Sequence, residues 1–387
     1  MFPQIFRHRG RIGQPGFVRP AEKAAEPASE PDAPSFEPKA IDVVIVKEML
    51  QKKLPPELIN TVLDHAEYWP HTTSVTSFEN LPEGKLKVLS GRSERENVFV
   101  IRSLPLGFVK STQFDGEYIT KALDPRSLSS EYSVEQFQKW IGNSVPTLEH
   151  PCRKIVFTIH SHDQGWGGNR TDTGTYHGSW TWFEPGIERF DAGGAGENNL
   201  KSSPSSKPNS MLATEQPPLS EQVSSINPAT STEDLESPSD DSSMDQALLT
   251  PDYSEVSEPM QLNETVLDTT SLRPIMPLLE PPSSNEDPST RRFHHDLLPS
   301  NMRIQCNMTA KKDTKAYRVQ WSWTDNIDPD SPQGDELEKQ GRGRATGTGE
   351  FVRNLKLGDV VTVWAKARFP MWVNHVEKVQ IDVYWAL

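Results

Sequence analysis

A long acidic segment divides this chain and decides which parts of it can fold. Residues 191–290 contain 18 acidic and three basic side chains, 19 serines and 13 prolines, and no tryptophan. Such a composition cannot bury enough apolar surface to offset the conformational entropy lost on ordering, about 1–2 kcal/mol per residue. We therefore expect residues 191–290 to form a disordered insertion.

The rest of the chain holds all ten tryptophans and carries almost no net charge. The 387 residues together have a net charge of −14, whereas 37 basic and 36 acidic side chains balance outside the acidic segment. Residues 1–40, with seven prolines and an early basic stretch, are predicted to be a disordered tail. A neutral folded part beside an acidic insertion would not attract phosphates, so we expect no nucleic-acid partner.

The order of these segments predicts one domain interrupted by the insertion. Residues 291–387 contain strand patterns but too few elements for a core of their own, and the last strand pattern needs an earlier partner. A long surface insertion is tolerated, because each doubling of loop length costs only about 0.6 kcal/mol. The predicted organisation is a helical pair (41–70), the first part of a β-sandwich (71–190), the insertion (191–290) and the second part of the sandwich (291–387).

Alternation of apolar and polar residues predicts an antiparallel β protein. In Tyr317–Thr324, tyrosine, valine and tryptophan alternate with polar side chains, as expected for a strand with one buried face. At least six such strands with glycine-rich connections favour a mainly β fold, an antiparallel β-sandwich of jelly-roll type. The other predicted strands are Val98–Leu104, Arg153–His160, Gly174–Phe183, Arg303–Met308, Asp359–Arg368 and Val376–Trp385, and Tyr132–Ile141 is predicted to be a short helix.

Two helices are predicted before the strands. Asp42 can cap the first, which would run to about Lys53, and the two prolines at 55 and 56 suit the first turn of the second. The stretch LPPELINTVL, residues 54–63, resembles the opening of an F-box, the helical module that docks onto a ubiquitin-ligase adaptor. Two hypotheses remain open here: an F-box-like adaptor, or an ordinary helical hairpin packed on the rest of the protein.

The most distinctive motif is HSHDQGWGG, residues 160–168, in a predicted loop between two strands. Metal binding needs three or four converging nitrogen or oxygen donors, and His160, His162 and Asp163 are the candidates for a metal-dependent enzyme. The alternative is a loop whose polar side chains satisfy backbone groups, without a bound metal or other cofactor.

A second hypothesis for the same loop is a lectin-like carbohydrate site. Sugars stack on tryptophan rings while amides and carboxylates bind their hydroxyls, which makes Trp166, Asn169, Asp172 and Trp372 candidate contacts. Tryptophans that alternate at strand spacing, such as Trp321 and Trp323, are instead expected in the core, where each buries about 150–250 Å².

Signals for other chemistry are weak. The glycine-rich stretch 341–350 lacks the lysine of a phosphate-binding loop, although Arg342 and Arg344 could hold an anion; the alternative is a hairpin connection. No Gly-X-Ser-X-Gly motif occurs, and Cys152 is expected to be a packed thiol. We therefore expect no enzymatic activity.

The strings RKIVFTIHSHDQGWGG, GTYHGSWTWF and LKLGDVVTVWAKARFP resemble a group of uncharacterised filamentous-fungal proteins. The resemblance covers the helical pair and both β-rich parts, and it implies that these parts belong to one unit. It implies no activity. With no run of about 18 apolar residues and no signal peptide, we expect a cytoplasmic or nuclear binding or scaffold protein with no membrane contact, and with a protein or a carbohydrate as partner.

Overall fold

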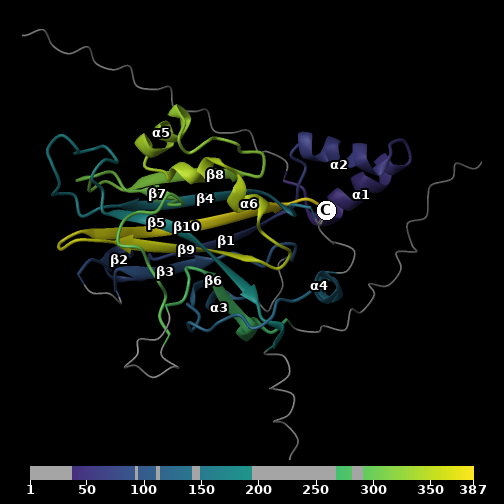
Figure 1. Ribbon diagram of the computed structural model, residues 1–387, viewed down its shortest axis with the longest axis horizontal. Coiled ribbons are helices and arrows are strands. Elements are labelled where there is room, and N and C mark those ends of the chain that lie inside the picture. Colours follow the sequence, from purple (N-terminus) through teal and green to yellow (C-terminus); the bar gives the residue numbers. More distant parts are fainter. Residues whose placement is uncertain (1–36, 92–94, 110–113, 142–148, 194–266, 281–290) are drawn as a thin grey trace, which may run out of the picture.

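A computed structural model describes residues 37–91, 95–109, 114–141, 149–193, 267–280 and 291–387. These residues form two antiparallel five-stranded sheets flanked by short helices (Figure 1). Among the described residues, no helix combines the length and hydrophobicity needed to span a bilayer. The predictions of disorder for residues 1–36, 194–266 and 281–290 lie outside the described residues.

Each sheet combines strands from both sides of the acidic segment. In sheet A the order is β1 (His71–Ser77), β10 (Val373–Trp385), β4 (Cys152–His162) and β8 (Lys315–Ser322), with β2 (Leu86–Leu89) also paired to β10. In sheet B the order is β3 (Asn97–Arg102), β9 (Val360–Ala367), β5 (Thr181–Phe190) and β6 (Leu272–Met276), with β7 (Gln305–Cys306) also paired to β5. The strands before and after the segment are therefore interleaved, which is why neither part could form its sheet alone.

The two sheets share one hydrophobic core. Trp321 of β8 and Phe157 of β4 in sheet A belong to the same buried cluster as Phe183 of β5 and Val363 of β9 in sheet B. The period-two pattern of β8 is confirmed, because Tyr317, Val319 and Trp321 are buried while the residues between them are exposed. Strand β9 is buried on both faces, in agreement with its largely apolar sequence VVTVWAKA.

Short helices surround the two sheets. Helices α1 (Ala40–Gln51) and α2 (Pro56–His65) lie at the end where the C-terminus also lies, and the β9–β10 turn projects at the opposite end (Figure 1). The remaining helices are α3 (Gly116–Thr120), α4 (Val134–Ile141), α5 (Pro332–Lys339) and α6 (Glu350–Arg353), with 3₁₀ turns η1 (Pro82–Gly84), η4 (Thr269–Ser271) and η5 (Arg344–Gly347).

Several predicted boundaries were wrong. The strand predicted at Gly174–Phe183 begins only at Thr181 and runs on to Phe190, because Gly174 and Gly178 adopt left-handed backbone conformations in a turn. The strand predicted at Arg303–Met308 is reduced to two residues. Helix α1 begins before Asp42, whose carboxylate accepts a hydrogen bond from the Lys39 backbone at 2.9 Å.

The predicted insertion was also too long at its C-terminal side. Residues 267–280 are ordered into η4 and β6, and β6 pairs with β5 at the edge of sheet B. Leu267 and Leu272 are 1% exposed and pack with Phe190 in a second apolar cluster near α3 and α4. Two leucines at the right spacing therefore outweigh the acidic composition around them.

Candidate functional site

The loop between β4 and β5 is held in place by Asp163. This buried carboxylate accepts hydrogen bonds from three backbone N–H groups: Gly165 at 2.7 Å, Ala310 at 2.6 Å and Lys311 at 3.0 Å. Burial raises the pKa of Asp163, and the three N–H donors act in the opposite direction. The carboxylate predicted as a metal ligand is thus occupied by the backbone, as the alternative hypothesis of a hydrogen-bonded loop describes.

Gln164 joins this loop to the β9–β10 turn. Its amide nitrogen donates to the Trp166 carbonyl at 2.5 Å, and its amide oxygen accepts from the Val373 N–H at 3.2 Å. The Trp166 side chain is 52% exposed. An exposed tryptophan on a backbone fixed by Asp163 and Gln164 is pre-organised for contact, so little ordering entropy would be lost on binding.

The β9–β10 turn carries two more exposed apolar side chains. Phe369 and Met371 have φ angles of 62° and 76°, in the left-handed region that residues other than glycine rarely occupy. Their exposed fractions are 40% and 67%, and Trp180 packs edge-on against Phe369 with ring centroids 4.4 Å apart. We call Trp166, Phe369 and Met371 the loop-end cluster.

The other residues predicted for carbohydrate binding differ in whether they are accessible to a ligand. Trp372 is only 9% exposed, so it offers no free face for stacking beside Trp166. Asp172 Oδ1 lies 3.1 Å from Nδ1 of the exposed His177. The backbone N–H of Asp172 donates to the Asn169 carbonyl. Asn169 itself is exposed, so Trp166 and Asn169 are the two predicted contacts that remain open to a ligand.

The predicted metal ligands do not form a chelating group. His162 stacks on His375 with ring centroids 4.6 Å apart, and its Nε2 lies 3.1 Å from Lys85 Nζ. His160 is half-buried two residues earlier on β4, opposite Lys378 of β10. Within the part of the chain that the structure describes, no group of three or more histidine, cysteine, aspartate or glutamate side chains is placed to hold a metal.

The two arginines predicted to hold an anion lie in different surroundings. Arg344 contacts two carboxylates, Asp335 at 2.5 Å and Glu338 at 2.7 Å, which would compete with any anion. Arg342 donates to the Gln320 carbonyl at 3.3 Å, and burial lowers its pKa. The glycine-rich stretch is therefore a structured connection containing η5, rather than an open anion site.

The buried thiols are not placed for nucleophilic chemistry. Cys152 is fully buried, and burial raises the pKa of its thiol well above its usual range. A thiol that resists ionisation in an apolar core is a poor nucleophile, as predicted for a packed cysteine.

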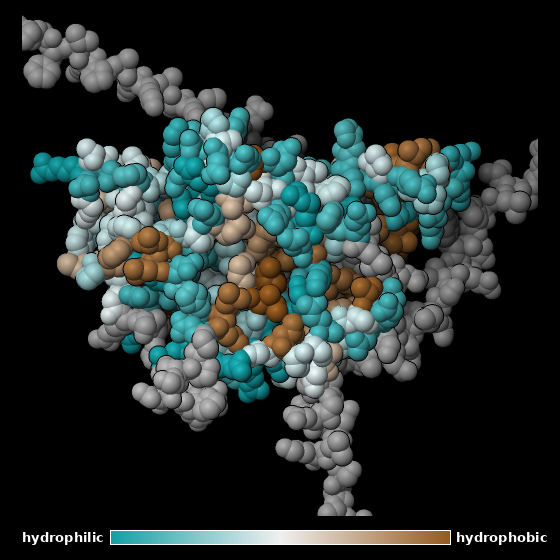
Figure 2. Space-filling model, in the orientation of Figure 1, coloured by the Kyte–Doolittle hydropathy of each residue, from teal (hydrophilic) through white to brown (hydrophobic). Residues whose placement is uncertain are grey.

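The helical pair presents a second exposed apolar surface. Its inner residues, such as Val43 and Ile59, are buried against the sheets. Its outer residues Ile41, Ile45 and Met49 on α1, and Leu58 and Val62 on α2, are 46–62% exposed and lie at helical spacing. Figure 2 shows hydrophobic atoms at the surface of the helical pair. We call these five residues the helical stripe.

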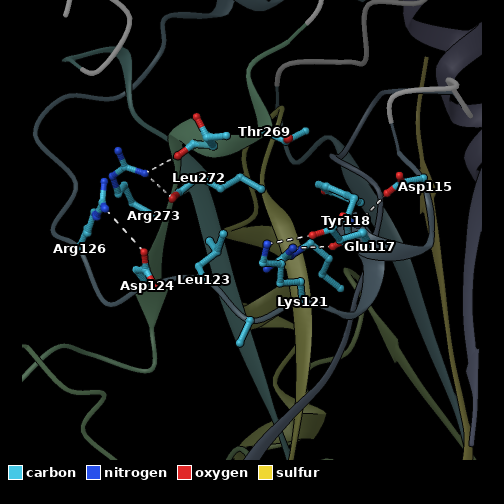
Figure 3. A pocket seen from close by; sticks show the side chains of 13 residues that line it. Asp115, Glu117, Tyr118, Lys121, Leu123, Asp124, Arg126, Thr269, Leu272 and Arg273 are labelled. Atoms are coloured by element: carbon cyan, nitrogen blue, oxygen red, sulfur yellow. Dashed lines mark hydrogen bonds and ion pairs between the residues drawn. The ribbon is translucent and has the colours of Figure 1, made fainter. Parts of the chain in front are cut away.

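A hollow of about 460 Å³ between α3 and β6 is not a comparable site (Figure 3). It contains four basic side chains, which makes it look cationic, but each of them has an acidic partner. The pairs are Arg102–Glu188, Lys121–Glu117, Arg126–Asp124 and Arg273–Asp191. Its charges are therefore already compensated within the protein.

The sequence anticipated only part of each surface. Trp166 was predicted as a possible carbohydrate contact and the F-box-like stretch includes the outer face of α2, whereas the outer face of α1 and the exposure of the β9–β10 turn were not predicted. The helical stripe does have a signal in the sequence, since the apolar residues of AIDVVIVKEMLQ occupy more than one face of the helix. The exposure of Phe369 and Met371 has no comparable signal, because it depends on a backbone conformation that the residue types disfavour. Comparisons with protein-family models, with curated proteins and with solved structures found no match to this chain.

Proposed function

We propose that this chain is a non-enzymatic adaptor that binds one partner protein through the helical stripe and a second ligand through the loop-end cluster. The observation that carries the proposal is the outer face of α1, where Ile41, Ile45 and Met49 are 48–62% exposed. A surface helix normally turns polar residues to solvent, so an exposed apolar stripe of this kind supports an interface.

The partner expected at the helical stripe is a protein that offers an apolar groove or helix face. Isoleucine, leucine, valine and methionine side chains spaced three and four residues apart fit such a groove, as in helix-in-groove recognition. The helices themselves are fixed to the sheets by the Arg153–Asp64 ion pair, with Nε–Oδ1 2.9 Å, so the stripe is held rigidly. A rigid apolar stripe binds without a large ordering cost.

The two surfaces lie at opposite ends of one strand. Val373 at the start of β10 contacts Gln164, and Leu387, just beyond its end, accepts a hydrogen bond from Lys47 of α1 through its carbonyl oxygen. The 13 residues of β10 correspond to about 40 Å. Two partners bound at these ends would not collide, which supports a bridging role.

We also propose that the two sheets form a jelly-roll sandwich. In that topology the first strand pairs with the last, the next with the one before the last, and each pair extends into its own sheet. The neighbours β1 and β10 in sheet A, and β3 and β9 in sheet B, support this assignment. Jelly rolls commonly bind ligands through the loops at one end, where the loop-end cluster lies.

An F-box-like adaptor is a second candidate for the helical end. The motif beginning at Leu54 places Leu58 and Val62 on the exposed side of α2, which favours docking to the ubiquitin-ligase adaptor. After α2, however, the chain enters β1 instead of a third helix. Direct binding of the purified adaptor would support this candidate, and absence of binding would leave a different protein as the partner.

A carbohydrate is a second candidate for the loop end, because Trp166 and the exposed Asn169 share one loop. A glycan array probed with the wild-type protein and with Trp166→Ala tests it. A glycan signal that disappears in Trp166→Ala supports a lectin-like role, and an array without signal removes it.

Proximity labelling in the native cell tests the adaptor proposal. Ile45→Glu combined with Val62→Glu places two charges in the helical stripe, and Gln51→Glu, also exposed on α1, is the matched control. We expect one set of neighbours to be lost only in the double variant and a different set only in Met371→Glu. If the double variant and the control label the same proteins, the helical stripe is not a docking surface.

A further inference from the structure

A separate pocket of about 420 Å³ lies on the outer face of sheet B. Glu184 of β5, Trp364 and Lys366 of β9 and Met276 at the end of β6 form its strand side, and Leu278 and His295 complete the lining. We call it the sheet-B pocket. Its volume is within the range of small-molecule sites, about 300–1,000 Å³.

The polar groups of the sheet-B pocket offer more donors than acceptors. Lys366 Nζ contacts Glu184 Oε2, its single partner among the described residues, although an ammonium has three N–H donors. Glu184 is fully engaged, because its other oxygen accepts from Trp182 Nε1 at 2.8 Å and from the Ser300 N–H at 3.0 Å.

Two further nitrogens of this pocket are unpaired. Trp364 Nε1 and His295 Nδ1 are buried and have no hydrogen-bond partner within the described ranges. Trp364 is 6% exposed, and the rings of Trp364 and His295 lie 5.0 Å apart. Trp364 Nε1 is an N–H donor, and an unpaired buried donor costs free energy unless a ligand satisfies it, so a ligand with acceptors is favoured.

The charged donor of the pocket selects the class of ligand. Lys366 is the one lysine or arginine among the described lining residues, its side chain is 3% exposed, and both oxygens of its partner Glu184 are engaged. Asp296, which also belongs to the lining, is 62% exposed. Burial, the largest cause, lowers the pKa of His295 to about 3, so its imidazole adds no second cation near neutral pH.

We propose that the sheet-B pocket binds a small organic monocarboxylate, whose carboxylate accepts hydrogen bonds from Lys366 and Trp364 and whose apolar body lies against Met276 and Leu278. A carboxylate forms a charge-assisted hydrogen bond with the Lys366 ammonium, which is stronger than a hydrogen bond to a neutral acceptor. The carboxylate oxygens supply the acceptors that Lys366 and Trp364 lack, and the methionine and leucine require an apolar remainder. A neutral ligand would satisfy the same donors with weaker hydrogen bonds.

Isothermal titration of the full chain with benzoate, 4-phenylbutyrate and octanoate, each beside its neutral amide, tests the proposal. We expect at least one acid to bind about tenfold or more tightly than its amide, because charge-assisted hydrogen bonds are the stronger ones. The double variant Glu184→Gln/Lys366→Gln keeps a hydrogen bond between the two side chains while removing both charges, and it should abolish the preference for the acid.

A second variant separates binding from folding. Leu278 is 69% exposed at the pocket, so Leu278→Trp should leave the fold intact and weaken the acid about tenfold by narrowing the entrance. Leu298→Trp, 54% exposed and outside the lining, is the matched control and should bind as the wild type does. Equal affinities for acid and amide, no saturable binding of any of the three acids, or full binding by Leu278→Trp would each overturn the proposal.

Discussion

The two ends of the β10 strand expose apolar side chains in opposite ways. At the helical end, Ile45 and Met49 are exposed by ordinary helical spacing, on a backbone without strain. At the loop end, Phe369 and Met371 are exposed on a backbone held in left-handed conformations. Exposure at the helical end therefore follows from the residue composition of α1, whereas exposure at the loop end has to be stabilised by other contacts.

The largest effect is expected where the helical end is attached to the sheets. Arg153 is 5% exposed, pairs with both oxygens of Asp64 and lies over the Trp323 ring at 4.1 Å. Arg153→Met leaves Asp64 without its charge partner, and we expect a loss of about 3–5 kcal/mol in the free energy of unfolding. Urea unfolding measures it. Lys154→Met, in the neighbouring and more exposed pair with Glu67, should cost about 1 kcal/mol or less.

The corresponding contact at the loop end is Asp163. Asp163→Ala removes the acceptor of three backbone N–H groups, and we expect a loss of about 2–3 kcal/mol. Trp166 fluorescence should also become more accessible to quenchers, because its loop loses its anchor. Asp172→Ala, a partly buried carboxylate of the same loop, is the control and should cost about 1 kcal/mol or less. Equal losses in both variants would mean that Asp163 is not the anchor.

Two methionines of similar exposure test the contrast in backbone strain directly. Met49 is 62% exposed inside α1, and Met371 is 67% exposed at a φ of 76°. Met49→Gly should lower the free energy of unfolding by about 1 kcal/mol, because glycine is a poor helix residue. Met371→Gly should raise it by up to about 1 kcal/mol, because glycine adopts the left-handed conformation without strain. If both changes have the same sign, the two ends do not differ in strain.

The smallest effect concerns pH at the loop end. Burial, and then the neighbouring His162 and Lys85, lower the pKa of His375 to about 4, and burial also lowers the pKa of His162. Both imidazoles have a pKa of about 6.5 in the unfolded chain. Between about pH 6.5 and about pH 4, the unfolded state therefore binds protons that the folded state does not. The free energy of unfolding consequently decreases as the pH is lowered through this range.

His375→Gln should make this decline shallower, as measured by urea unfolding at several pH values. Because the His375 ring is only half-buried, solvent screening keeps the effect small. His65→Gln, an exposed histidine at the helical end, is the control, and its pH curve should run parallel to that of the wild type. A parallel curve for His375→Gln as well would exclude His375 as the cause.

The same contrast explains how much of the structure the sequence could predict. Strands β8 and β10 were predicted within a few residues, because Tyr317, Val319 and Trp321, and Val379, Ile381 and Val383, alternate with polar residues and are buried as expected. Helix α2 was predicted from its prolines and apolar face. Patterns of this kind are local, so they can be recognised in the sequence without knowledge of distant partners.

Features that depend on distant contacts were missed or misplaced. Strand β1 is rich in threonine and serine and has one open face, and β6 lies inside the acidic segment, so neither showed a clear pattern. Trp372 was expected at a binding surface but is buried, and Arg344 was expected to be free but is paired with Asp335 and Glu338. Each of these outcomes depends on neighbours brought together only by the fold.

The pairing of β5 with β6 has a consequence for how this protein can change. Phe190 lies opposite Leu272, so the polypeptide leaves sheet B and re-enters it at adjacent positions. Whatever connects these two points can be shortened, lengthened or exchanged for a compact cargo domain with closely spaced termini, at a closure cost of about 0.6 kcal/mol per doubling of length. The connection between β5 and β6 is therefore a position where a further domain could be inserted with little effect on sheet B.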